Sequence, residues 1–167
     1  YVEAPFPSCS HGWAMNQILT QVMGLPREQR PTYLWWWDND CVALKREVFQ
    51  HVYQKVWDKR TVWGQAWQAS HKQKARPGNH PYASQACLCF ATELYDALGR
   101  PDCDHHNPRS DPAEEITYAA EEKGYTVALQ YPSFAATKTT ELSQTSWYGR
   151  GNVYGPGLTY HESRADL

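Results

Sequence analysis

The feature that most constrains the fold is a pair of apolar stripes at helical spacing in the first half of the chain. The stripes recur every four residues and consist of Leu44, Val48, Val52 and Val56 in one, and of Phe49, Tyr53 and Trp57 in the other. Residues four apart share one face of a helix. We therefore expect an amphipathic helix that is capped by Asp38, Asn39 or Asp40 and continues weakly through Trp67, with a kink at Gly64.

Three further helices are predicted from start and stop signals. They are one from Ser8 or Ser10 to Gly24, one capped by Ser84 and ended by Gly99 and Pro101, and one from Asp111 to Gly124. The last has the strongest start signal, because Pro112 stands at the first helical position and Glu114 follows the cap by three residues. A carboxylate at that position reaches back to the amide of the cap and forms a capping box.

The C-terminal part of the chain is typical of strands and turns. Tyr125–Tyr131 predicts a strand with a buried middle, the Ser-, Thr-, Gly- and Tyr-rich residues that follow predict short strands, and "GLTYHES" around His161 reads as one of them. Helices followed by strands predict an α+β fold, with N-terminal helices packed on a small, mostly antiparallel sheet from the C-terminal part. The length predicts a single domain over residues 1–167.

Composition argues against two classes of partner. The formal net charge of −2 gives no electrostatic drive toward nucleic acid, and no apolar run is long enough to cross a membrane. We expect a protein or peptide substrate or partner, and we assign no oligomeric state. The chain opens "YVEAPFPSC" without an initiator Met, which is consistent with a processed, secreted chain or with a piece of a longer one.

The cysteines have several candidate roles. The chain contains Cys9, Cys41, Cys87, Cys89 and Cys103. Because the number is odd, at least one thiol stays free if every disulfide is internal. The sulfurs could serve as nucleophile, metal ligands, disulfide halves or core filling.

As a nucleophile, Cys87 is the preferred candidate. It falls in the first turn of the predicted third helix, where unpaired amides and the helix dipole lower the pKa of a thiol. His161 would act as general base, and Asp166 or Asn152 would orient its imidazole. Gln85 could donate to the oxyanion.

A cysteine that opens a helix, followed later by a histidine on a strand, resembles the papain-like thiol hydrolases and transglutaminase-like enzymes in outline. For Cys87 and His161, the resemblance implies a hydrolase or acyl-transfer enzyme that cleaves an amide or peptide bond without a cofactor. Attack would give a thioester that water or an amine resolves. The competing interpretation is packing, because Cys87 shares a helical stripe with Ala91, Leu94 and Leu98.

A structural zinc ion is the alternative role for the sulfurs. Five candidate ligands fall within twenty residues, namely Cys87, Cys89, Cys103, His105 and His106. Zinc prefers four thiolate or imidazole ligands in a tetrahedron. A disulfide from Cys103 to Cys9, Cys41 or Cys89 would explain the same residues.

The eight Trp and eleven Tyr residues suggest a second class of function. Trp and Tyr dominate binding hot spots. We expect Trp35, Trp36 and Trp37 to supply exposed aromatic surface and the aromatics of the second helix to lie in the core. The alternative to the enzyme is thus a non-enzymatic interaction protein, stabilised by zinc or disulfides, that binds a protein or carbohydrate through a Trp-rich surface.

Overall fold

The computed structural model describes residues 11–69, 80–104, 110–136 and 151–162. The helices are α1 (His11–Gly24), the 3₁₀ turn η1 (Arg27–Gln29), α2 (Val48–Val56), α3 (Thr92–Leu98) and α4 (Glu114–Glu122). The strands are β1 (Tyr33–Trp37), β2 (Cys41–Ala43), β3 (Thr61–Gln68), β4 (Pro81–Ala91), β5 (Thr126–Gln130), β6 (Pro132–Ala136), β7 (Gly151–Tyr154) and β8 (Thr159–Glu162). The α+β class is confirmed. Strands begin at Tyr33 and alternate with helices, so the chain does not place all its helices before its strands.

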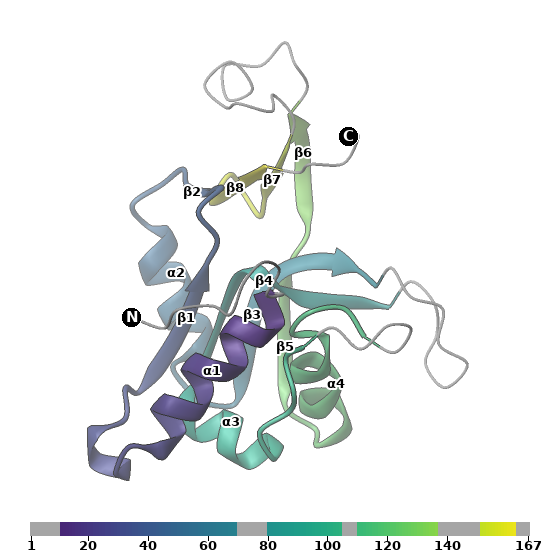
Figure 1. The fold of residues 1–167 in the computed structure, drawn as a ribbon. Helices are drawn as coiled ribbons and strands as arrows, with labels where there is room; N and C mark the ends of the chain where they lie inside the picture. Colours follow the sequence, from purple (N-terminus) through teal and green to yellow (C-terminus); the bar gives the residue numbers. More distant parts are fainter. Residues whose placement is uncertain (1–10, 70–79, 105–109, 137–150, 163–167) are drawn as a thin grey trace.

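The strands form two sheets. The main sheet has the order β1-β4-β3-β5, in which β3 and β5 are parallel and the other neighbours antiparallel. The small sheet has the order β2-β8-β7-β6 and is antiparallel throughout. Figure 1 shows the small sheet above one end of the main sheet. The chain passes between the two sheets three times, from β1 to β2, from β2 through α2 to β3, and from β5 to β6.

Helices cover both faces of the main sheet. Apolar residues of α1, α3 and α4 form one core cluster with one face, and those of α2 form a second cluster with the other face. Side chains alternate across a strand, and β1 follows that rule. Leu34 and Trp36 pack in the first cluster, whereas Trp35 and Trp37 pack in the second. The three consecutive tryptophans therefore contribute side chains to the core clusters on both faces of the main sheet.

The prediction of a helix capped by Ser84 is wrong, because this segment is the central strand β4. Every residue from Tyr82 to Ala91 is buried, and β4 lies between β1 and β3. A strand buried on both faces shows a continuous apolar run instead of an alternation, which periodicity alone does not separate from a buried helix. The helix α3 begins only at Thr92 and ends, as predicted, at Gly99, which adopts a φ of 88°.

The long second helix is confirmed only in its middle. Val48, Val52 and Val56 are buried on α2 as predicted. The residues before it form β2 and those after it form β3. The expected kink at Gly64 is instead an irregular step in the β3–β4 register, where an added Cβ would meet the Cβ of Ala83 at 2.8 Å.

The remaining local predictions agree well with the structure. The helix α1 ends at Gly24 as predicted, with its start at Ser8 or Ser10 outside the described residues, and β5 and β8 lie where strands were expected. The helix α4 begins at Glu114 instead of Pro112, and its N-cap is Ala113 and not Asp111 as predicted. The Asp111 amide does donate to Glu114 Oε2 at 2.7 Å, so the predicted contact between these two residues forms although Asp111 is not the cap. Among the described residues, no helix is both long enough and apolar enough to span a membrane.

Candidate functional site

The structure places Cys87 in the middle of β4, fully buried, and not at a helix N-terminus. Its Sγ accepts a hydrogen bond from Trp35 Nε1 at 3.5 Å. The argument that helix amides activate this thiol therefore does not apply. The prediction failed because it depended on the helix now replaced by β4.

For several other predicted site residues, the structure gives no contact with Cys87 among the described residues. Gln85 also lies in β4, and its Oε1 accepts a hydrogen bond from Ser84 Oγ at 3.3 Å. Asp166, like the proposed zinc ligands His105 and His106, lies outside the described residues. The roles proposed for these residues remain predictions.

The three cysteines of the proposed zinc site are not brought together. Cys87 and Cys89 belong to the cluster on the α2 side of the main sheet, whereas Cys103 belongs to the cluster on the opposite side. Burial raises the pKa of Cys89 and that of Cys103 to about 12 in the metal-free protein. A zinc site needs its ligands around a single ion, and these three sulfurs do not share one side of the sheet. The structure therefore offers no Cys87–Cys89–Cys103 ligand set.

His161 is the predicted residue whose neighbours include other side chains of the kinds found in catalytic or metal sites. In the small sheet it is the direct cross-strand neighbour of Cys41 on one side and of Asn152 on the other. Residues directly opposite in antiparallel strands project from the same face. His161 is 5% exposed, and its Nε2 lies 3.3 Å from Asp40 Oδ1. A thiol, an imidazole, an amide and a carboxylate thus gather around β2, β8 and β7.

Residues of the main sheet close this arrangement from the other side. Gln65 of β3 directs its Nε2 to Thr159 Oγ1 at 2.9 Å and to Cys41 Sγ at 3.5 Å. The ring of Trp67 lies edge-on to the ring of His161, with 5.3 Å between centroids. We use the name junction cluster for the residues that meet between the sheets, namely Cys41, Gln65, Trp67, Cys87 and His161.

The Cys41 thiol is protonated in this environment. A hydrogen bond with the Cys87 thiol raises the pKa of Cys41 far above its usual range, and burial raises it further. Cys41 thus contacts Cys87 while pairing across the strands with His161. Sequence reasoning missed Cys41 because it assigned "DNDC" to the start of a helix, although an acidic pair directly before a cysteine was the available signal.

Within the described part of the chain, the residues that could hold a metal ion are Asp38, Asp40 and His161. Each offers one ligand atom, and these atoms all lie within 4.8 Å of one another. Burial raises the pKa of the Asp38 carboxyl, whereas the nearby His11 lowers it by a smaller amount. The nearby charge of Asp40 raises that pKa further. The donor set of two carboxylates and one imidazole is compatible with several divalent metals.

A second candidate site is an aromatic surface on α2. Three side chains on its outer stripe are exposed, Phe49 at 57%, Tyr53 at 47% and Trp57 at 63%. We call these three residues the aromatic face. Behind them lie half-buried aromatics of β1, with centroid distances of 5.7 Å for Tyr33–Tyr53 and 5.0 Å for Trp35–Phe49. The sequence prediction placed these two groups the other way round, with the β1 tryptophans exposed and the helix aromatics in the core.

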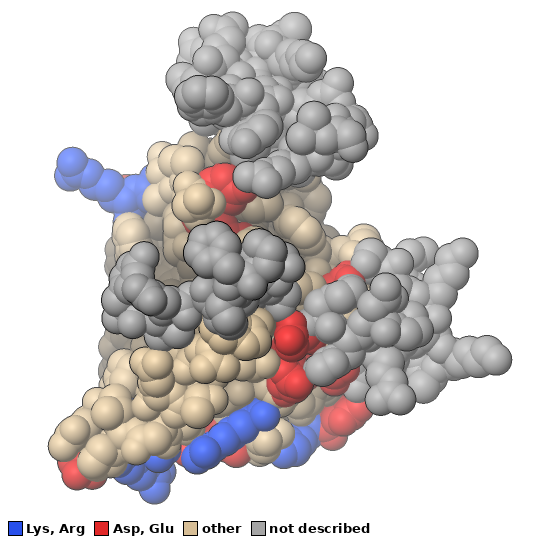
Figure 2. Space-filling view, in the orientation of Figure 1, with Lys and Arg blue, Asp and Glu red and all other residues tan. Residues whose placement is uncertain are grey.

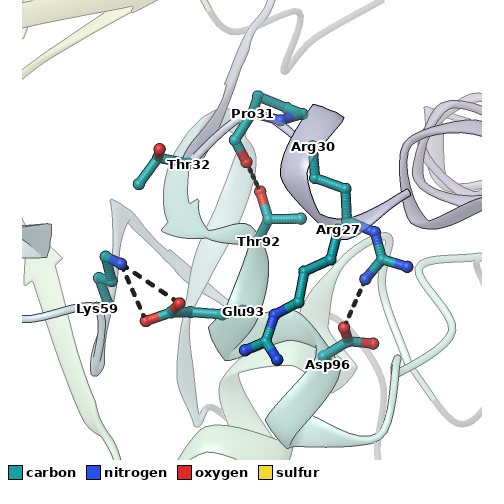
Figure 3. Close-up of a pocket in the computed structure, with 8 residues that line it drawn as sticks. All are labelled: Arg27, Arg30, Pro31, Thr32, Lys59, Thr92, Glu93 and Asp96. Carbon is teal, nitrogen blue, oxygen red and sulfur yellow. Dashed lines mark hydrogen bonds and ion pairs between the residues drawn. The ribbon is translucent and has the colours of Figure 1, made fainter. Parts of the chain in front are cut away.

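The charged side chains form local pairs. Figure 3 shows a pocket of about 130 Å³ in which Arg30 pairs with Asp96 at 2.8 Å and Lys59 with Glu93 at 3.3 Å, while Arg27 reaches in from η1. On the face drawn in Figure 2, basic and acidic side chains of the described residues lie side by side along the lower edge. Mutually neutralised charges of this kind give no strong field of one sign.

Comparison with protein-family models and with curated proteins gives no match for this sequence. The function must therefore be argued from the junction cluster and the aromatic face themselves.

Proposed function

We propose that the chain is an interaction protein that binds a protein or peptide partner through the aromatic face. One observation carries this proposal. Phe49 and Tyr53 lie one turn apart on α2, Trp57 follows one turn later as the C-cap residue, and each is about half exposed or more. Isolated exposed apolar residues are ordinary, but contiguous exposed apolar patches on a folded chain mark interaction sites.

The side chains of the aromatic face are already ordered. Tyr53 packs edge-on against Tyr33 and against Trp57, and the Tyr33 hydroxyl donates to the Trp57 carbonyl at 3.3 Å. A side chain that is held before binding loses less conformational entropy when a partner arrives. Rigid aromatic anchors of this kind supply most of the energy in typical interfaces.

The geometry favours a peptide over a carbohydrate. The rings of Tyr53 and Trp57 are inclined at 69° to each other, so they present edges and a notch instead of a flat stacking platform. Beside them, β1 is the edge strand of the main sheet in the described part of the chain. An extended peptide can add to such an edge through main-chain hydrogen bonds while its apolar side chains enter neighbouring pockets.

The test is a selection of peptides against the native protein. A displayed peptide library is enriched on the wild type, and the enriched peptides are then measured on a variant with Phe49→Ser, Tyr53→Ser and Trp57→Ser. The matched control is Ile18→Ser on α1, a side chain that is 42% exposed. We expect apolar peptides whose affinity falls by at least tenfold in the triple variant and is unchanged in the control. Equal binding to the wild type and the triple variant, or no enrichment, would refute the proposal.

A second candidate function is a cysteine-dependent hydrolase or acyl-transfer enzyme with Cys41, not Cys87, as nucleophile. The observation that favours it is the cross-strand pairing of Cys41 with His161, whose imidazole lies beside the Asp40 carboxylate. His161 would take the thiol proton as Sγ attacks an amide carbonyl, and Gln65 would donate to the oxyanion. The raised pKa and burial of Cys41 oppose this activity, so it ranks second.

Alkylation of the native protein, after treatment with a dithiol reductant that is then removed, tests this second function. If Cys41 is a nucleophile, iodoacetamide labels it faster than Cys89, and His161→Ala slows the labelling. Labelling of Cys41 no faster than that of Cys89, which is 3% exposed, would refute it.

A further inference from the structure

Two buried cysteines from different sheets have their side chains in contact. Cys41 opens β2 of the small sheet, and Cys87 lies in β4 of the main sheet. Neither forms a disulfide in the structure, both pack in the same buried cluster, and the nearby Cys87 side chain is the main cause of the raised pKa of Cys41. Gln65 Nε2 lies 3.5 Å from the sulfur of Cys41, and Trp35 Nε1 lies 3.5 Å from that of Cys87. Each sulfur therefore accepts a hydrogen bond from a different side chain, which restricts its position.

The backbone around both cysteines is fixed as well. The amide of Asp38, three residues before Cys41, donates to the carbonyl of Ala86, directly before Cys87, at 3.0 Å. The Cys41 amide donates to the Asp38 carbonyl at 3.0 Å, and Trp37 Nε1 donates to the Cys41 carbonyl at 2.5 Å. Because these bonds bring the two chain segments together independently of the sulfurs, a covalent bond between the thiols requires no change of topology.

The other described cysteines do not share this arrangement. Cys103 packs in the core cluster on the opposite side of the main sheet, with the sheet between it and Cys41. Its Sγ lies 3.8 Å from the Pro101 carbonyl, within its own turn. Cys89 shares the α2-side cluster but stands two residues from Cys87 along the strand, opposite Trp35 of β1 and Trp63 of β3.

We propose that Cys41 and Cys87 form a disulfide that locks the small sheet onto the main sheet. Each thiol gives up its proton and one electron, and one S–S bond forms between the two sulfurs. The two electrons and two protons reduce a disulfide oxidant, such as oxidised glutathione, to two thiols. Because Cys41 is 5% exposed and Cys87 fully buried, the exchange takes place before β2 docks, and the folded protein then shields the bond. The bond would join β2 to β4, close to the point where the chain first crosses from the main sheet to the small sheet.

The cross-link is independent of binding at the aromatic face. It does bear on the second candidate function, because a sulfur in a disulfide is not a nucleophile. In that case, hydrolase activity would appear only after a dithiol reductant has opened the bond.

The test is peptide mapping of protein refolded with oxidised and reduced glutathione. Free thiols are blocked with N-ethylmaleimide under denaturing conditions, and the protein is digested without reductant. We expect one species that joins the Cys41 peptide to the Cys87 peptide, and that separates on reduction. Recovery of both peptides alkylated, or of either one joined to another cysteine, would overturn the proposal.

Three variants make the assignment specific. Cys41→Ser should release Cys87 for alkylation, Cys87→Ser should release Cys41, and Cys89→Ser should leave the link in place. A reductant should lower the melting temperature of the wild type and of Cys89→Ser but not of the other two. If Cys89→Ser abolished the link, the pairing would be wrong. If a variant fails to fold, fragmentation of the linked wild-type peptide in the mass spectrometer decides whether Cys87 or the neighbouring Cys89 carries the bond.

Discussion

Gln65 Nε2 donates a hydrogen bond to Thr159 Oγ1 at 2.9 Å and so connects β3 of the main sheet to β8 of the small sheet. Both residues are buried, at 0% and 1% exposure. A buried polar group that loses its hydrogen-bond partner retains its full desolvation penalty, which destabilises the folded state. This bond therefore helps to hold the two sheets in the relative position that creates the junction cluster.

Thr159→Val keeps the shape of the side chain and removes the acceptor for Gln65. We expect a loss of about 1–3 kcal/mol in the free energy of unfolding, because the Gln65 amide is left without that acceptor in the interior. Urea unfolding followed by circular dichroism measures it. Gln68→Ala, at an exposed position of the same strand, is the control and should change stability by no more than about 0.5 kcal/mol. A Thr159→Val protein as stable as the control would mean that the bond contributes nothing.

The helix α1 requires glycine at position 12. An added Cβ at Gly12 would lie 2.0 Å from the Cys103 carbonyl oxygen and 2.5 Å from Asp104 Cα, which are backbone atoms that cannot rotate away. Gly12→Ala should therefore cost roughly 1–3 kcal/mol or more. Gly24→Ala in the same helix meets nothing within 4 Å and should be neutral or slightly stabilising. Equal melting temperatures for the two variants would show that α1 does not pack this closely on the turn after α3.

His51 makes stability depend on pH. Burial, together with the charge of Lys55, lowers the pKa of His51 below its usual 6.5. The unfolded chain therefore binds a proton more readily than the folded chain, and the stability that neutral His51 contributes is lost as pH falls below the unfolded pKa. Between about pH 7.5 and about pH 5, the urea midpoint of the wild type should fall further than that of His51→Gln. Parallel midpoints for the two proteins would contradict a lowered pKa.

The two stripes of α2 should differ in their contribution to stability. Val52→Ala removes a side chain that is 1% exposed and should cost roughly 2 kcal/mol. Trp57→Ala removes a side chain that is 63% exposed and should cost no more than about 1 kcal/mol, despite its contact with Tyr53. Chemical denaturation of both variants provides the measurement. A larger loss for Trp57→Ala would mean that the aromatic face is structural.

Elements specified by local signals could be predicted from the sequence. The helix α1 has a regular apolar spacing and a glycine stop, α4 has its capping pair, and β5 is a short apolar run between turn residues. In contrast, β4 is a strand because β1 and β3 flank it and helices cover both its faces. Its composition of Ala, Cys, Leu and Phe carries no alternation, and a local pattern does not contain the tertiary contacts that decided its conformation.

The candidate sites show the same limit. His161 could be identified as a strand residue from its surroundings, but its neighbour Cys41 lies 120 positions earlier in the chain, and only the pairing of β2 with β8 brings them together. The aromatic stripe of α2 could be recognised, although not its exposure. Because the valine stripe of α2 faces the core, the adjoining aromatic stripe lies at the surface.

The most direct test of the proposed function follows the indole N–H resonances of the eight tryptophans while a selected peptide is added to the protein. We predict that the resonance of Trp57 shifts first and most, that Trp35, which lies against Phe49, follows, and that Trp67 in the junction cluster does not shift. A peptide that shifts Trp67 and leaves Trp57 unchanged would contradict binding at the aromatic face and would direct attention to the junction cluster instead.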